Sequence, residues 1–224
     1  MILSMEGTMR KIAFLITCGI SIFLISCTAF AEELKPIQLP KPQMDGGRPL
    51  MQVLKDRSSS REFSPQKLPL QVLSNLLWAA SGINRSDSGK RTAPSAANWQ
   101  DIDIYVATAE GLYLYDAKPH VLKPVLAGDI RALTGHQPFV KEAALNLIYV
   151  ADFSRIGRGA NEEKDFFSAA DTGFIAQNVY LFCASEGLAT VVRASIDKPT
   201  LAKTMKLKPD QRITLSQTVG YPKK

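Results

Sequence analysis

The stretch Glu162–Glu186, EEKDFFSAADTGFIAQNVYLFCASE, is the longest helical pattern in the sequence, and we expect the fold to be built around it. It contains no proline, Gly187 follows it, and apolar or small residues fill most of its length. A helix that is apolar nearly all round lies at the centre of a protein or in a subunit interface. We therefore predict a helix that is central or lies in a subunit interface, where Ala170 and Gly173 let another helix approach closely.

The flanking segments predict a mixed α and β fold. Leu73, Leu76, Leu77 and Ala80 recur at helical spacing in a helix that Gly82 ends. Further helices are predicted over about 130–143 and, capped by Asp197, over 197–205, with a polar loop over 83–91. Apolar runs predict strands over 102–106, 112–115, 145–150, 188–193 and 213–219.

Residues 1–31 have the pattern of a secretory signal peptide. Arg10 and Lys11 precede an apolar run over 12–25, and Ala29-Phe30-Ala31 supplies a cleavage site. A competing route is open, because Leu24-Ile25-Ser26-Cys27 resembles the lipobox of bacterial lipoproteins. We expect an exported, periplasmic protein that associates with the membrane only if Cys27 is lipidated. Residues 32–48 then form an extended leader and residues 49–224 one domain.

Several classes of function are disfavoured by composition. The net charge of +6 is spread along the chain without a basic, aromatic-rich stripe, so we expect no nucleic-acid partner. The only histidines, His120 and His136, have no metal-ligand spacing, and we predict no metal site. Cys183 is the only cysteine outside the predicted signal peptide, and we expect it to be buried and unreactive.

A cradle for an anion is predicted at Arg57-Ser58-Ser59-Ser60-Arg61, just after a short helix that starts near Met51. Two guanidinium groups provide forked donors that match phosphate oxygens, and the serine hydroxyls add further donors. An Arg/Ser run of this kind is also typical of a solvated turn.

Four segments together resemble the nitroreductase family of FMN flavoproteins. They are RSSSREF with LPLQVLSNLLWAASGI, then APSAANWQ before the strand IDIYV, then DTGFIAQNVYLFCASEGLATVV, and finally QTVGYPKK. The resemblance covers about residues 50–222 and is greatest to short, SagB-like members related to dehydrogenases that oxidise azoline rings in peptides. It implies an α+β, three-layer, homodimeric fold with a central, mainly antiparallel mixed sheet flanked by helices.

The resemblance also implies a set of FMN-binding residues. Arg57, Ser58, Ser59 and Arg61 would bind the phosphate, and Lys223 of the short C-terminal tail would help. The family's ring-edge and ribityl contacts from the partner subunit fall on Pro94, Ser95, Ala96, Asn98 and Gln100. Backbone N–H groups of Ala194 and Ser195 would face flavin N5, although Val192 and Ser195 stand where many members have Pro and Gly.

The activity implied is hydride transfer between NAD(P)H and an electron-poor acceptor, such as a nitroaromatic compound or a quinone, in a ping-pong cycle through FMN. No side chain is predicted to be catalytic, because the cofactor performs hydride chemistry and the protein orients it. The alternative is an exported protein of the same fold that binds flavin or a related ligand without turnover. Export favours this alternative, because FMN and NAD(P)H are mainly cytoplasmic.

Overall fold

The computed structural model describes residues 33–157 and 159–224 as an α+β structure. The predicted signal peptide and the lipidation site at Cys27 lie outside these residues. Within the described part of the chain, we find no helix with the length and hydropathy that a bilayer crossing requires.

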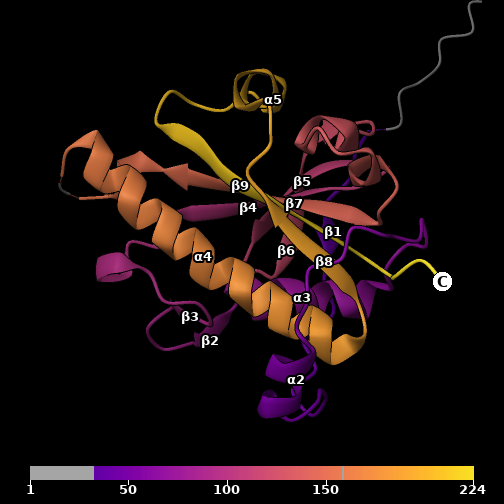
Figure 1. The fold of residues 1–224 in the computed structure, drawn as a ribbon. Helices are drawn as coiled ribbons and strands as arrows, with labels where there is room; N and C mark the ends of the chain where they lie inside the picture. The colour runs from indigo at the N-terminus through magenta and orange to yellow at the C-terminus, as the bar shows by residue number, and fades with distance from the viewer. Residues whose placement is uncertain (1–32, 158) are drawn as a thin grey trace, which may run out of the picture. The chain divides into compact units, whose positions relative to one another are not determined.

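A seven-stranded sheet forms the middle of the domain (Figure 1). Its strand order is β1-β6-β5-β4-β7-β9-β8, and neighbouring strands are antiparallel at every pair. The strands are β1 (Ile37–Gln38), β4 (Ile102–Ala107), β5 (Gly111–Asp116), β6 (Val121–Ala127), β7 (Leu145–Asp152), β8 (Ala189–Arg193) and β9 (Gln211–Gly220). A separate hairpin pairs β2 (Ile83–Arg85) with β3 (Lys90–Arg91).

Helices cover both faces of this sheet. They are α2 (Leu50–Asp56), α3 (Leu70–Ser81), α4 (Asn161–Glu186) and α5 (Lys198–Met205), with short 3-10 turns η1 (Ala96–Asn98), η2 (Arg131–Thr134), η3 (Pro138–Lys141) and η4 (Phe153–Arg155). In β7, Leu147 and Tyr149 pack in the cluster that contains α3 and α4, whereas Ile148 and Val150 pack with α5. Because both faces of β7 are buried, its sequence is continuously apolar. The predicted three-layer arrangement is confirmed.

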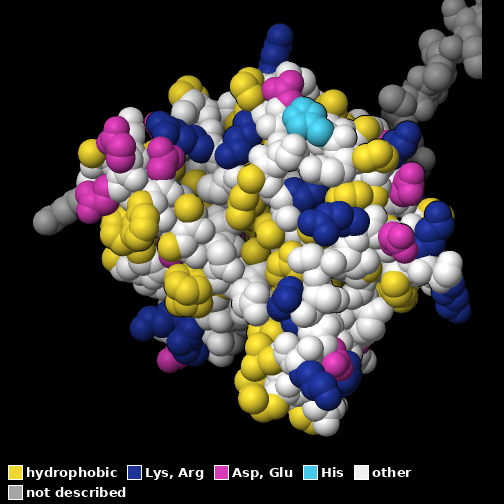
Figure 2. Space-filling model, in the orientation of Figure 1, with side chains coloured by type: hydrophobic (Ala, Val, Ile, Leu, Met, Phe, Trp, Pro, Cys, Tyr) yellow, Lys and Arg dark blue, Asp and Glu magenta, His cyan; other side chains and the backbone are white. Residues whose placement is uncertain are grey.

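Within one chain, helix α4 is buried along only one side, which contradicts the central position of the two that its sequence predicts. Ile175, Val179 and Cys183 contact the core, but Phe166 and Phe174 are 69% and 49% exposed. Hydrophobic side chains therefore gather on the visible face over α4 and over α2 (Figure 2). Gly187 ends the helix in the left-handed conformation, with φ 68°, as its sequence position predicts.

The predicted helix over 130–143 is wrong. The chain forms the separate turns η2 and η3 there, because Gly135 has an extended backbone and Pro138 starts a new turn. A Cβ atom on Gly135 would lie 1.8 Å from Nη1 of Arg193, so a larger residue would displace the Arg193 guanidinium. The predicted loop over 83–91 contains the β2–β3 hairpin, and strand β6, which pairs with Ile37 and Gln38 of the leader, was not predicted.

Replacing Leu76 with alanine should lower the free energy of unfolding by about 2–5 kcal/mol. Its side chain is fully buried between α3 and the sheet, so truncation leaves a cavity. Leu70→Ala in the same helix is the matched control, since Leu70 is 44% exposed and should cost about 0.5 kcal/mol or less. Urea titration of both variants measures the difference, and equal losses would contradict this packing.

Candidate functional site

The predicted anion cradle lies at the end of α2, beside the edge strand β8. The backbone N–H of Arg57 donates to the Val53 carbonyl at 2.8 Å and ends the helix. The chain then runs past β8, where the Ser60 N–H donates to the Thr190 carbonyl at 3.0 Å. The cradle is therefore fixed at both ends, as a preorganised binding segment requires.

Tyr180 of α4 is the main side chain that supports the cradle. Its hydroxyl lies 2.9 Å from the Ser59 hydroxyl and accepts a hydrogen bond from the Val192 N–H at 3.0 Å. Because that N–H group supplies a hydrogen, the tyrosine can donate its own to Ser59. The Arg57 guanidinium lies 5.3 Å from the centre of the tyrosine ring, within cation–π distance. This role could not be predicted from the sequence, since Tyr180 falls in an apolar helical run.

The charges around the cradle leave its cations available for an anion. The Asp56 carboxylate is paired with Arg48, and neither Arg57 nor Arg61 forms an ion pair with any residue that the structure describes. At the foot of the cradle, Ser58, Tyr180 and Thr190 line a polar cavity of about 210 Å³, together with Asp56, whose carboxylate is paired with Arg48. This donor set is suited to a phosphate group.

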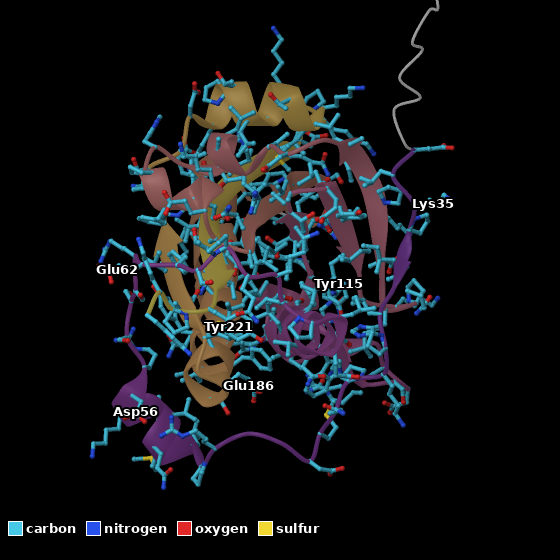
Figure 3. The ribbon with its side chains drawn as sticks, turned by 90° about the vertical axis from the view of Figure 1, so that its right-hand side faces the viewer. Lys35, Asp56, Glu62, Tyr115, Glu186 and Tyr221 are labelled. Atoms are coloured by element: carbon cyan, nitrogen blue, oxygen red, sulfur yellow. The ribbon has the colours of Figure 1, made fainter. Side chains whose placement is uncertain are left out.

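The C-terminal tail lies beside the cradle. The Lys223 N–H donates to the Glu62 carbonyl at 3.3 Å, and the Ser64 N–H donates to the Tyr221 carbonyl at 2.9 Å. Figure 3 shows Glu62 and Tyr221 on the same side of the domain, above Asp56 at the end of α2. The structure thus brings Lys223 next to the residues with which it was predicted to act.

Ala194 and Ser195 follow β8 directly and are exposed. The preceding Arg193 is buried and fixes this strand end, because its guanidinium donates to the Thr134 carbonyl, Asn146 Oδ1 and Thr218 Oγ1 at 2.7–2.9 Å. Burial lowers the pKa of Arg193 to about 10. From Thr190 to Ser195 the strand advances about 16 Å, so the cradle and this exposed end suit the two ends of an elongated ligand.

The segment Pro94–Gln100 has an unusual backbone. Ala97, Asn98 and Gln100 have positive φ angles of 47°, 57° and 49°, a conformation that non-glycine residues adopt at a cost. The segment is held by hydrogen bonds from the Gln100 N–H to Ser95 Oγ, 2.9 Å, and from Arg91 Nε to Gln100 Oε1, 2.8 Å. A strained backbone that is held by several hydrogen bonds is typical of functional segments.

The predicted site residues fall into two groups within one chain. The Ala96 N–H is held by Asp171 of α4, whereas the cradle is held by Tyr180 of the same helix. These positions are nine residues apart, which is about 14 Å along a helix. The structure does not bring Pro94–Gln100 to the cradle of the same chain. The assignments of Arg57, Ser58, Ser59, Arg61, Pro94, Ser95, Ala96, Asn98, Gln100, Ala194, Ser195 and Lys223 to FMN remain predictions.

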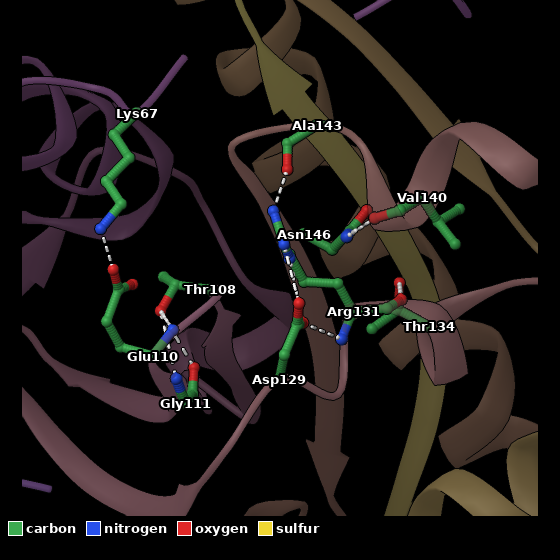
Figure 4. A network of polar contacts seen from close by, with 10 residues as sticks. All are labelled: Lys67, Thr108, Glu110, Gly111, Asp129, Arg131, Thr134, Val140, Ala143 and Asn146. Carbon is green, nitrogen blue, oxygen red and sulfur yellow. Dashed lines mark hydrogen bonds and ion pairs between the residues drawn. The ribbon is translucent and has the colours of Figure 1, made fainter. Parts of the chain in front are cut away.

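A groove of about 900 Å³ lies next to the cradle, between Phe63–Lys67, Arg131, Lys141 and Tyr221–Lys224. Its inner cations are already engaged (Figure 4). Lys67 pairs with Glu110, and Arg131 donates to both carboxylate oxygens of Asp129 and, at 2.7 Å, to the Ala143 carbonyl. Lys141, Lys223 and Lys224 also line the groove and form no ion pair with a described residue, so cations remain available to an anion both here and in the cradle.

His120, which was expected in a loop or surface role, is part of a polar chain. Ser74 Oγ donates to the Pro40 carbonyl at 2.5 Å, so it accepts from His120 Nε2 at 2.7 Å, and Tyr115 donates to His120 Nδ1 at 3.0 Å. Burial lowers the pKa of His120. Because Ser74 is fully buried and its hydrogen is engaged, this chain attaches the leader and does not form a nucleophile.

The remaining thiol and metal expectations concern Cys183 and the acidic residues. Cys183 is buried, as predicted, and burial raises the pKa of its thiol. Across residues 33–157 and 159–224, no group of three or more His, Cys, Asp or Glu side chains is arranged to hold a metal ion.

The model of the Nitroreductase family matches residues 54–221. The chain belongs to the nitroreductase family. A Methanocaldococcus jannaschii protein named as a nitroreductase is 31% identical over 173 residues, which cover 71% of this chain and 85% of the relative. A crystal structure from Ralstonia eutropha JMP134, also described as a nitroreductase, is 46% identical with a TM-score of 0.81, and the match covers 85% of this chain and 91% of that chain.

A more distant neighbour shares the nitroreductase fold. It is the NADPH:FMN oxidoreductase of Vibrio harveyi in complex with NAD+, with 19% identity, a TM-score of 0.60, and coverage of 78% of this chain and 69% of that chain. The predicted nitroreductase-like fold is confirmed by the family model and the Ralstonia structure.

Replacing Tyr180 with phenylalanine should destabilise the protein by about 1–3 kcal/mol, because the Val192 N–H and Ser59 hydroxyl lose their shared partner. Tyr113→Phe is a suitable control, since this buried β5 tyrosine has no hydrogen bond from its hydroxyl to the described residues. Denaturant unfolding measures both changes. If the two variants are equally stable, the hydroxyl does not support the cradle.

Proposed function

We propose that this member of the nitroreductase family is an FMN-dependent oxidoreductase that transfers a hydride between NAD(P)H and a small, electron-poor acceptor such as a nitroaromatic compound or a quinone. The observation that carries the proposal is the cradle Arg57–Arg61 with unpaired cations beside β8. Membership of the nitroreductase family supports oxidoreductase chemistry. The name of the Vibrio harveyi neighbour, and its complex with NAD+, support flavin and nicotinamide as the cofactor and donor.

The residues present fit FMN. Arg57, Arg61 and the serine hydroxyls can supply hydrogen-bond donors for the phosphate. The backbone N–H of Lys223 donates to the carbonyl of Glu62, which directly follows Arg61. The exposed Ala194–Ser195 segment lies at the other end of β8, where backbone N–H groups can orient the ring. When bound, FMN supplies the ring that accepts and donates the hydride.

The protein's own contribution is binding and orientation. The only cysteine described, Cys183, is buried with a raised thiol pKa, and His120 is engaged with Ser74 and Tyr115. Neither is placed to act on a substrate above β8. This arrangement suits hydride transfer, which needs no nucleophile or metal from the protein.

We further propose a homodimer in which Pro94–Gln100 of one subunit completes the site of the other. The family resemblance assigns Pro94–Gln100 to the site of the partner subunit, and within one chain this segment and the cradle are held at positions about 14 Å apart on α4. Exposed apolar residues on α2 and α4 provide a surface that a second copy would cover (Figure 2). A SagB-like subgroup and export to the periplasm, with Cys27 as an alternative lipid anchor, belong to the same proposal.

Purified protein should therefore bind FMN, and NADH or NADPH should bleach its flavin absorbance. Binding without bleaching would favour the alternative of a flavin-binding protein without turnover. A protein that neither takes up FMN nor oxidises the nucleotide would overturn the proposal.

Replacing Arg57 with alanine should weaken FMN binding roughly tenfold to a hundredfold, since one charge-assisted interaction is lost. The fold should be kept, because Arg57 is at the end of α2 and forms no ion pair with the described residues. Fluorescence quenching of FMN measures the affinity. Arg212→Ala, an exposed arginine of β9 paired with Asp165, is the matched control and should bind FMN as the native protein does. Unchanged affinity in Arg57→Ala would remove the cradle from the site.

Charged substitutions on the apolar surface should prevent dimerisation. Met51 of α2 is 75% exposed and Phe174 of α4 is 49% exposed, so Met51→Glu and Phe174→Glu place a charge in the interface without disturbing the core. Sedimentation velocity should show monomers for these variants and dimers for the control Val125→Glu on β6, where Val125 is 40% exposed. Dimers in all three proteins would place the interface elsewhere.

A further inference from the structure

Two carboxyl groups are buried beneath the strained segment Pro94–Gln100. Asp171 of α4 is 2% exposed, and Asp101, just before β4, is fully buried. Both oxygens of Asp171 accept from the Ala96 N–H, at 3.1 and 3.0 Å. The Asp101 carboxyl reaches the same face of α4 one turn earlier, at Ser168, and is the side chain that, next to burial, most raises the pKa of Asp171. The Ser168 hydroxyl donates to Asp101 Oδ2 at 3.0 Å. The pair therefore connects the helix, the sheet and the strained segment.

One oxygen of this pair lacks a donor. Asp101 Oδ1 is buried, and no described N–H or hydroxyl group bonds to it. A buried carboxylate oxygen without a partner is costly, and two buried carboxylates in contact cannot both be ionised without a further cost. A single proton on one carboxyl group removes both costs, because the O–H donates to the other carboxyl.

Among the residues that the structure describes, no cation is placed to neutralise the pair. The Arg155 guanidinium forms an ion pair with Asp103 and donates to the Asp101 backbone carbonyl, not to its carboxyl group. Arg91 of β3 is engaged with Gln100 and Ser81. The other acid at this end of the sheet, Asp152, accepts from Ser154.

We propose that Asp171, sharing one proton with Asp101, is a positioning residue that holds Pro94–Gln100 in its left-handed conformation and makes that hold depend on pH. The consequence for FMN rests on the proposed function, because this segment would contact the cofactor of the partner subunit. The shared proton itself does not rest on it.

The sign of the pH dependence follows from the causes at the pair. Burial, and next the Asp101 carboxyl, raise the pKa of Asp171 to about 7, and the Ala96 N–H opposes this rise without cancelling it. An aspartate whose pKa is raised in the folded protein stabilises the folded state most fully when the pH is below the pKa of the unfolded chain, which is near 4 for aspartate. This stabilisation is lost as the pH rises through the folded-state pKa of about 7. The segment should therefore become less stable as the pH rises. A salt-bridged aspartate has the opposite pH dependence, because it stabilises the fold more at higher pH.

The decisive variant is Asp171→Asn, because asparagine keeps an acceptor for Ala96 and a donor for Asp101 but does not titrate. Infrared spectra of the native protein at about pH 6 should show the carbonyl band of a protonated carboxylic acid, which titrates away at about pH 7 to 8. The band should be absent in Asp171→Asn. Asp165→Asn, an exposed acid of the same helix paired with Arg212, is the control and should keep the band.

Binding and stability provide the second readout. Native thermal stability should fall between about pH 4 and pH 7 and native FMN affinity should fall as the pH rises through about 7, and Asp171→Asn should flatten both profiles. Asp171→Ala should weaken FMN binding roughly tenfold at every pH, because the Ala96 N–H then has no acceptor. Rescue by asparagine but not by alanine separates positioning from a general structural defect.

Several results would overturn the inference. The native protein could show no band of a protonated carboxyl group. Alternatively, the stability or FMN affinity of Asp171→Asn could depend on pH as that of the native protein does. If Asp171→Asn does not fold, Asp101→Asn removes the same proton from the other side and is measured in its place. If the native protein binds no FMN, the proposed function fails, and the band together with the pH-dependent NMR shift of the Ala96 amide still decides the role of the pair.

Discussion

The position of α4 against the sheet is the constraint on which the rest of this structure depends. One side of the helix must bury Ile175, Val179 and Cys183 against the strands, and this fixes its rotation. Asp171 and Tyr180 are then held in place by the same packing, one at the strained segment and the other at the cradle. Since a helix is stiff, the spacing between these two attachment points is set by its rise and not by loop geometry.

This arrangement explains why so few polar contacts suffice to organise the candidate site. Tyr180 contacts both the cradle and β8, and the buried guanidinium of Arg193 fixes the far end of the same strand through three hydrogen bonds. Buried polar groups that are satisfied on several sides rigidify their surroundings. The exposed groups of the candidate site are therefore held in place by Tyr180 and Arg193, whose hydrogen bonds restrict their rotamers.

Much of the fold was predictable because its patterns are local. The apolar run of β7, the hairpin of β4 and β5, the Asp197 cap of α5 and the stop at Gly187 all depend on neighbouring residues. The prediction of a helix over 130–143 was wrong because the Arg193 side chain of the distant strand β8 packs against Gly135, where the chain is extended. The pairing of Asp101 with Asp171, and the support that Tyr180 gives to Ser59, were not predictable, since they join segments far apart in sequence. The cradle could be predicted because its chemistry lies within five consecutive residues, and its binding of an anion stays a prediction.

The bond from Ser60 to Thr190 has a consequence for solubility. Strand β8 is at an edge of the sheet, and an uncovered edge offers its backbone groups to strands of other molecules. By crossing this edge, the cradle segment occupies a backbone acceptor that would otherwise be free. The segment that is predicted to bind an anion therefore also protects the sheet against edge-to-edge aggregation, and detaching it would expose the backbone of β8 to other strands.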